Sequence, residues 1–226
     1  MFSALTARGS GTSSGGTIYL LRHGAIQFPK DCKRYIGWHN PPLNSIGFRQ
    51  AVAWADYFSG LGLEEICCSD LIRCRVTAGI ISARFSIESR AYPELREVSL
   101  GAWEGKSFEY VQTLQPQEFQ MRGENLADHR PPGGESFRDL QNRAWPLFET
   151  VVRRLRKRTL IVTHAGVIRV LLCRLLGMPL ERLFSIGQSY GALTIIDVHP
   201  KGCRIQGVNL QQPQKAPSAG RLTVLS

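Results

Sequence analysis

The sequence lacks the features that would mark a membrane protein, a zinc protein or a disulfide-stabilised fold. No apolar run reaches the roughly 18 residues that argue for a membrane span. The six cysteines show no C-x-x-C spacing, and His39 and His129 supply no second half of a zinc site. No signal peptide is evident, and several cysteines lie in apolar segments, which favours a reducing compartment. We therefore expect a soluble, cytoplasmic protein without a structural metal.

The chain has fewer acidic residues than basic residues. The 226-residue chain has 28 Lys and Arg against 18 Asp and Glu, a formal net charge of +10. This excess favours anionic partners such as phosphorylated metabolites, nucleic acid or acidic lipid. The densest basic cluster, residues 153–158, lies at the end of a predicted helix, where cations complement the dipole. Because no aromatic residues interleave with it, we expect a solvated helix end and no nucleic-acid or membrane partner.

Both ends of the chain have too little apolar surface to order themselves. Residues 1–16 are rich in Gly, Ser and Thr, and residues 211–226 carry Pro and Gly in a polar setting. We expect both to be loose tails, the first of them either native or a remnant of cloning. The intervening length fits a single domain over residues 17–210, with no internal repeat.

Short apolar runs alternate with helical patterns inside this domain. Buried strands are predicted at residues 17–21, 65–68 and 159–163, with a closing hairpin over 192–209. Helices are predicted from Asn44 or Ser45 to 60, from a cap at Ser69 or Asp70 to 81, over 135–156 with a kink at Pro146, and over 166–176. This alternation predicts a three-layer α/β/α sandwich with a mainly parallel sheet.

Basic and imidazole side chains come after three of the predicted strands. Ligands bind to such sheets in the crevice beyond the carboxyl ends of the strands. Arg22 and His23 follow the first strand, Arg73 lies near the end of the second, and His164 follows the third. A neutral imidazole can attack phosphorus near pH 7, and guanidinium groups stabilise the charge on a transferring phosphoryl group. The sequence therefore predicts phosphoryl transfer with His23 as the nucleophile.

Three further residues complete the predicted site. Gly24 has no side chain, which lets the turn close and a phosphate approach the backbone. Ala165 comes after the third strand at the start of a helix, where its N–H can donate to an anion. Glu97 lies in a segment without helical or strand regularity and is the candidate acid for the leaving oxygen, although Glu94 and Glu104 lie close.

Five ordered segments resemble the motifs of the histidine phosphatase superfamily. They are residues 21–24 (LRHG), 42–51 (PLNSIGFRQA), 69–78 (SDLIRCRVTA), 97–105 (EVSLGAWEG) and 162–169 (VTHAGVIR). The resemblance implies a phosphoglycerate mutase-like fold and a phosphohistidine at His23. It also implies a phosphate pocket of Arg22, Arg73 and His164, with Glu97 as the proton donor. No metal and no organic cofactor are implied.

Two more segments, residues 34–37 (RYIG) and 131–136 (PPGGES), resemble the α-ribazole phosphatases of cobalamin nucleotide-loop assembly. The chain departs from relatives at Ala25-Ile26, where they often have Glu-Thr or Glu-Val, and at Asn40-Pro41, where they have Asp. These departures touch the substrate rim, so they bear on the substrate and not on the chemistry.

The leading expectation is a phosphomonoesterase that acts on a small phosphorylated metabolite, with α-ribazole 5′-phosphate as a candidate. A cofactor-dependent phosphoglycerate mutase is the alternative, although residues 106–130 are short for the insert that encloses a bisphosphate. A non-catalytic phosphate-binding protein is the third reading. Because dimers are common among soluble enzymes, we also expect a homodimer.

Overall fold

One six-stranded sheet forms the centre of the molecule in the computed structural model, which describes residues 15–28, 33–155 and 157–212. The strand order is β3-β2-β4-β1-β5-β6. The bounds are β1 Gly16–Arg22, β2 Glu65–Ser69, β3 Ser89–Tyr92, β4 Arg158–Thr163, β5 Leu193–His199 and β6 Gly202–Leu210. Strands β1 to β4 run parallel, β5 pairs antiparallel with β1, and β6 pairs antiparallel with β5. The predicted mainly parallel sheet is confirmed.

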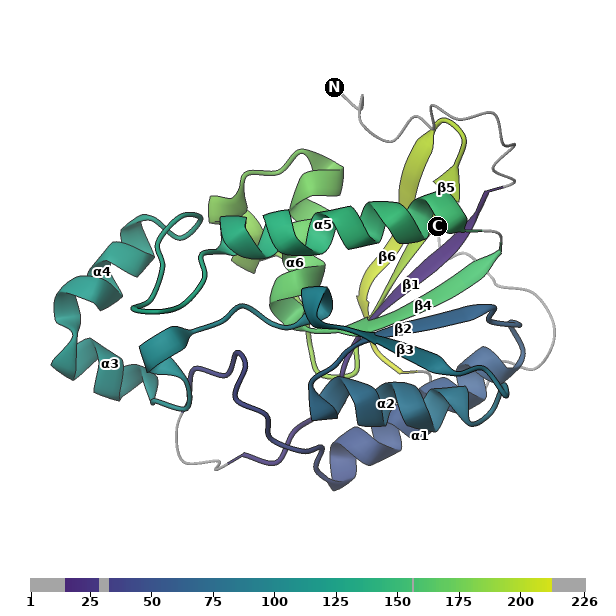
Figure 1. Ribbon diagram of the computed structural model, residues 1–226, viewed down its shortest axis with the longest axis horizontal. Coiled ribbons are helices and arrows are strands. Elements are labelled where there is room, and N and C mark those ends of the chain that lie inside the picture. Colours follow the sequence, from purple (N-terminus) through teal and green to yellow (C-terminus); the bar gives the residue numbers. More distant parts are fainter. Residues whose placement is uncertain (1–14, 29–32, 156, 213–226) are drawn as a thin grey trace.

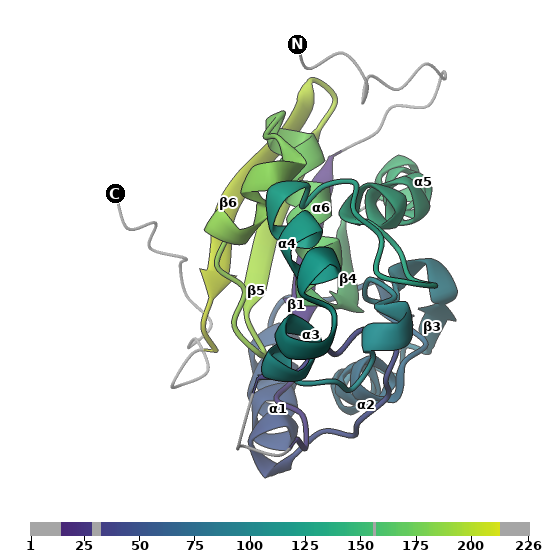
Figure 2. The ribbon, with the colours of Figure 1, turned by 90° about the vertical axis from the view of Figure 1, so that its left-hand side faces the viewer.

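Helices cover both faces of this sheet (Figure 1). The α-helices are α1 Ser45–Ser59, α2 Ile72–Ser82, α3 Phe108–Leu114, α4 Pro116–Glu124, α5 Phe137–Arg154 and α6 Ala165–Leu176; the short 3-10 helices are η1 Pro93–Leu95, η2 Gly101–Trp103 and η3 Leu180–Ser185. Helices α1 and α2 lie on one face, and α5 and α6 lie on the other. Helices α3 and α4 project to one end, at the left in Figure 1 and toward the viewer in Figure 2. The α/β/α sandwich is thus confirmed.

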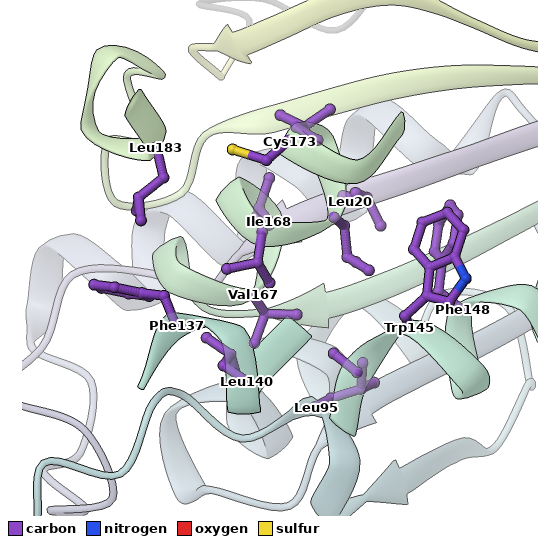
Figure 3. Close-up of a cluster of buried hydrophobic side chains, with 14 of the residues drawn as sticks. Leu20, Leu95, Phe137, Leu140, Trp145, Phe148, Val167, Ile168, Cys173 and Leu183 are labelled. Atoms are coloured by element: carbon purple, nitrogen blue, oxygen red, sulfur yellow. The ribbon is translucent and has the colours of Figure 1, made fainter. Parts of the chain in front are cut away.

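The side chains of β1 point alternately into the two cores, because strand side chains alternate between sheet faces. Ile18 and Leu20 belong to the core under α5 and α6, whereas Tyr19 and Leu21 belong to the core under α1 and α2. Figure 3 shows the first of these cores, with Leu20 close to the side chains of α6. Full burial of such a side chain contributes about 1.5–3 kcal/mol. Both cores therefore fix β1, the strand that leads into His23.

The predicted cap of α2 is wrong. Its N-cap residue is Leu71, which makes no side-chain cap hydrogen bond. Ser69 Oγ instead accepts a hydrogen bond from the Leu71 N–H, and Asp70 forms an ion pair with Arg96. Neither polar side chain therefore caps an N–H group of the first helical turn.

The helix predicted over residues 135–156 runs from Phe137 to Arg154. A capping box closes its first turn, in which Ser136 and Asp139 each accept a hydrogen bond from the other's backbone N–H. Pro146 lies inside the helix without ending it. Residue 156 and most of the predicted tails, 1–14 and 213–226, lie outside the described residues. Strand β3 and helices α3 and α4 have no counterpart in the sequence prediction.

The cysteines in the described part of the chain are free: Cys67, Cys68, Cys74, Cys173 and Cys203. Those same residue ranges contain no group of three or more His, Cys, Asp or Glu side chains that could hold a metal ion. Within the described ranges, no helix is long and apolar enough to cross a bilayer.

Candidate active site

The carboxyl ends of β1 and β4 lie side by side. Arg22 is paired with Thr163 in the parallel register, and the His23 N–H donates to the Thr163 carbonyl oxygen at 3.0 Å. The next residues along the two strands are His23 and His164, whose ring centroids are 5.1 Å apart. Their exposed fractions are 4% and 0%. The structure thus brings both predicted histidines together at one buried edge.

The hydrogen bonds of His23 select one tautomer. Its Nδ1 lies 2.8 Å from the Gly24 carbonyl oxygen, and because a carbonyl can only accept, Nδ1 carries the proton. The Nε2 atom therefore keeps its lone pair, and the Nε–H of Arg73 donates to it at 3.3 Å. Burial, and then the charges of Arg73 and Arg22, hold the pKa of His23 well below its ordinary value. His23 is accordingly a neutral imidazole at pH 7 whose Nε2 lone pair accepts a hydrogen bond from Arg73.

His164 has the opposite tautomer. Its Nδ1 accepts from the Arg73 Nε–H at 3.3 Å, so its proton lies on Nε2, which is 2.9 Å from Ser69 Oγ. Burial and Arg73 hold its pKa well below the ordinary value as well. The second histidine is therefore neutral, and it is oriented by Ser69.

Arg73 lies between the two imidazoles and is 1% exposed. Its Nη1 donates to the His39 carbonyl at 2.8 Å, and its Nη2 donates to the Gly37 carbonyl at 2.7 Å. A guanidinium has five N–H donors, so two remain available beyond these contacts and the one at Nε. Arg73 is therefore held rigidly while still able to donate to an anion.

Arg22 reaches the same edge from the end of β1. Its Nη1 donates to the Gln188 carbonyl at 2.6 Å, and its guanidinium carbon lies 3.7 Å from the Tyr190 ring centroid. The Tyr190 ring is also 5.6 Å from the ring of His23. The side-chain amide of Gln188 is buried, and its nitrogen and oxygen have no hydrogen-bond partner within the described residues. Gln188 and Tyr190 are site residues that the sequence reasoning missed.

Gly24 lies where a side chain would clash with the start of α1. A Cβ atom at this position would lie 2.5 Å from the Gly47 carbonyl oxygen at the start of α1. The Gly24 N–H donates to Thr77 Oγ1 at 3.3 Å. The glycine thus permits close packing of the loop on α1, and its contact with a phosphate stays a prediction.

Glu97 lies against the first turn of α6. Its carboxylate accepts hydrogen bonds from the Gly166 N–H at 3.0 Å and from the Val98 N–H at 2.9 Å. A Cβ atom on Gly166 would overlap Glu97 Oε1, so only glycine leaves room for this contact. The helix that starts at Ala165 therefore directs an N-terminal donor to a carboxylate of the chain. Whether the Ala165 N–H donates to a phosphate stays a prediction.

Glu104, which sequence alone suggests is a solvated loop residue, organises the loop over residues 37–39. Its carboxylate accepts from the backbone N–H groups of Gly37 at 3.0 Å, Trp38 at 2.6 Å, His39 at 3.0 Å and Leu100 at 3.1 Å. The carbonyl groups of the same loop hold Arg73. Glu104 is thus connected to the buried guanidinium through one short segment of backbone.

Trp103 is fully buried, as expected for a packing residue. Glu94, the other nearby glutamate, is exposed. The geometry therefore distinguishes the loop glutamates: Glu97 is bonded to α6, Glu104 to the 37–39 loop, and Glu94 faces solvent.

A covered parallel sheet with imidazole and guanidinium groups at its carboxyl edge is suited to phosphoryl transfer. Comparisons with known proteins agree with this class. Residues 18–211 match the histidine phosphatase superfamily (branch 1). The chain belongs to this superfamily, and it is a phosphatase enzyme.

Several relatives carry names of particular activities. The adenosylcobalamin/α-ribazole phosphatase of Escherichia coli K12 is 26% identical over 197 residues, which cover 85% of this chain and 95% of the relative. A probable phosphoglycerate mutase, GpmB of Serratia proteamaculans, is 33% identical over 166 residues, which cover 72% of this chain and 75% of the relative.

Solved structures show the same relationship. The α-ribazole phosphatase from Shigella flexneri matches with a TM-score of 0.79 at 25% identity, over 85% of this chain and 96% of that one. The mycobacterial glucosyl-3-phosphoglycerate phosphatase Rv2419c matches with a TM-score of 0.76 at 26% identity, over 87% and 100%. The chain is similar to phosphatases that are named for different substrates.

Proposed function

We propose that this phosphatase is a phosphomonoesterase that hydrolyses a small phosphorylated metabolite through a phosphohistidine at His23. The observation that carries the proposal is the tautomer of His23. Its Nδ1 proton is held by the Gly24 carbonyl, which leaves the Nε2 lone pair beside Arg73. A neutral, buried imidazole oriented in this way is ready for attack on phosphorus.

The reaction takes two steps. In the first, His23 Nε2 forms a bond to phosphorus while the bond to the leaving oxygen breaks, and Glu97 gives that oxygen a proton. In the second, Glu97 takes a proton from water, whose oxygen attacks phosphorus and releases His23. Arg22, Arg73 and His164 donate to the equatorial oxygens, where negative charge develops.

The test is removal of the nucleophile. Replacement His23→Ala is expected to lower phosphate release from an aryl phosphate by more than about a thousandfold, because the other imidazole of the site, His164, has its Nδ1 bonded to Arg73 and its proton on Nε2 beside Ser69. His199→Ala, at an exposed histidine at the end of β5, is the matched control and should retain full activity. Labelled substrate should also leave acid-labile phosphate on the parent enzyme but none on His23→Ala. Full activity in His23→Ala would refute the mechanism.

For the substrate, α-ribazole 5′-phosphate is one candidate, supported by the similarity to the Escherichia coli and Shigella flexneri enzymes. A panel of phosphorylated metabolites with phosphate detection tests it. The 33% identity to a probable phosphoglycerate mutase supports the alternative function. Isomerisation of phosphoglycerate without net phosphate release would favour that mutase. The cytoplasmic location and the homodimer stay predictions.

A further inference from the structure

A cavity of about 350 Å³ lies beside Glu97. Aromatic side chains from α3, α4, α5, η3 and the loop before α1 dominate its walls: Tyr35, Phe108, Phe119, Phe137 and Phe184. The rings of Tyr35 and Phe108 are stacked, with centroids 4.2 Å apart. The volume is at the small end of the range of about 300–1,000 Å³ found for small-molecule sites. Size and lining therefore fit an apolar or aromatic group on the leaving side of the scissile bond.

The charged residues of this cavity are mainly cationic. Among the described residues that line it, the cations are Arg34, Arg122 and Arg169, and the carboxylate is that of Glu97. Arg169 donates to the Ile186 carbonyl, and the Glu97 carboxylate is bonded to backbone N–H groups. Within the described walls, no carboxylate forms an ion pair with Arg122 or Arg169.

Arg122, on α4, is one of the two arginines of this cavity that form no ion pair within the described residues. It is 9% exposed, and its guanidinium carbon lies 5.1 Å from the ring centroid of Phe137 and 5.9 Å from that of Trp103. Within the described part of the chain it forms no ion pair, and its Nη1 is buried without a hydrogen-bond partner. Burial lowers the pKa of the guanidinium, yet arginine stays charged in proteins.

Moving a cation out of water into a buried site without a counter-ion costs several kcal/mol of desolvation free energy. An apolar side chain of similar size at the same place would not have this desolvation cost. Two part-buried arginines elsewhere in the fold are paired with a carboxylate: Arg96 with Asp70, and Arg143 with Glu135. Arg122 lacks such a carboxylate among the described residues, and the space next to it is the cavity beside Glu97. An anion brought by a ligand would supply the missing partner.

We propose that this cavity binds the leaving group of the substrate and that Arg122 pairs with a second anionic group on it. The substrate class is then a phosphate monoester whose leaving alcohol joins an apolar or aromatic body to a carboxylate or a second phosphate. The inference rests on the proposed function, because it places the scissile phosphate at Arg22 and Arg73 and the leaving oxygen at Glu97. The leaving group of α-ribazole 5′-phosphate is uncharged, so this compound would occupy the apolar part of the cavity alone.

The test compares phosphate monoesters whose leaving groups differ in whether they carry a second anionic group. The probes are 2-naphthyl phosphate, its 6-carboxylate and its 6-phosphate, together with α-ribazole 5′-phosphate as a natural compound whose leaving group is uncharged. For each probe, kcat/KM is measured for the parent enzyme, Arg122→Met, Arg122→Lys and Arg84→Met. Arg84 is an exposed arginine just after α2 that pairs with Asp56, so its replacement removes the same charge away from the cavity.

The parent enzyme is expected to prefer one of the anionic naphthyl probes over 2-naphthyl phosphate. Arg122→Met should lower kcat/KM for that probe by about 10- to 100-fold, the effect of losing a charged hydrogen bond. It should change kcat/KM for 2-naphthyl phosphate by less than about threefold, with Arg122→Lys intermediate. The better of the two anionic probes distinguishes a carboxylate from a phosphate.

Equal loss on every probe in Arg122→Met, or no preference of the parent enzyme for an anion, would overturn the inference. Loss of 2-naphthyl phosphate turnover in His23→Ala tests the proposed function separately from the role of Arg122. If no probe is turned over, calorimetric binding of 2-naphthoate against 2-naphthol decides: the parent enzyme should bind the carboxylate at least about tenfold more tightly, and Arg122→Met should not. Thermal unfolding of each variant checks that the fold is retained.

Discussion

Glu104 offers the sharpest test of how the site is held together. Its two carboxylate oxygens accept four backbone N–H groups, with Gly37 and His39 on Oε2 and Trp38 and Leu100 on Oε1. Replacement Glu104→Gln keeps the size of the side chain but turns one oxygen into an NH₂ group. Two of the four backbone N–H groups then face this NH₂ group, which cannot accept their hydrogen bonds.

The size of the effect can be worked out from these contacts. A hydrogen bond to a charged group contributes about 1.5–3 kcal/mol, and the part-exposed position of Glu104 reduces this. We expect loss of two such bonds to lower the unfolding free energy by about 2–4 kcal/mol, which corresponds to about 4–16 °C in Tm for a domain of this size. The carbonyls of Gly37 and His39 hold Arg73, so activity should fall as well. A displacement of about 1 Å can cost about a hundredfold, and we expect kcat/KM to drop by about 10- to 100-fold.

The assay pairs thermal unfolding with kcat/KM for an aryl phosphate and with inhibition by inorganic phosphate. Glu94→Gln removes the same charge from an exposed position and should change none of these quantities. Weaker phosphate inhibition in Glu104→Gln would show that Arg73 has moved. An unchanged Tm refutes the anchoring role, and a lowered Tm with unchanged kcat/KM and phosphate inhibition refutes the connection to Arg73.

Two further predictions concern the glycine beside Glu97 and the buried histidines. Gly166→Ala should displace the Glu97 carboxylate, which the added Cβ would overlap, and lower kcat. The matched change Gly79→Ala meets no atom within 4 Å, so it should leave activity intact and stabilise α2 by about 0.5–1 kcal/mol. Because His23 and His164 have lowered pKa values, the unfolded chain binds more protons below about pH 6.5. The unfolding free energy should therefore fall as pH drops below that value, by up to about 1.4 kcal/mol per pH unit for each histidine. His164→Asn should remove one histidine's share of this slope in urea unfolding, and an unchanged slope would contradict the assignment.

The meeting of the two histidines could be predicted from sequence because each comes directly after a buried apolar run. Parallel strands end at one edge, which places both histidines at the same edge of the sheet, and the pairing of β1 with β4 brings them close together. The tautomers could not be predicted in the same way. They depend on the Gly24 carbonyl for His23 and on Ser69 for His164, and these contacts arise only once the loops are folded.

The sequence reasoning missed Gln188 and Tyr190 because of the direction of the strand that follows them. In a parallel sheet, ligands lie beyond the carboxyl end of each strand, which points to the residues after a strand and not to those before it. Strand β5 runs antiparallel to β1, so its beginning, and not its end, lies at the catalytic edge. The polar segment over residues 187–191, directly before an apolar strand, was the available signal. Recognising it requires knowing that the hairpin packs antiparallel against the first strand.

The distribution of unpaired cations links the phosphate pocket to the neighbouring cavity. Within the described residues, Arg22, Arg73 and Arg122 form no ion pair with a carboxylate, although each has a buried guanidinium nitrogen or is itself buried. Burial lowers the pKa of all three guanidinium groups. The proposed phosphate accounts for Arg22 and Arg73, because Arg73 is bonded to His23 and the charge of Arg22 acts on the same imidazole. Arg122 lies on a different wall, that of the aromatic cavity, so the same phosphate cannot account for it. If ligand anions offset the cost of buried cations, the proposed substrate carries two anionic groups separated by the apolar space beside Glu97.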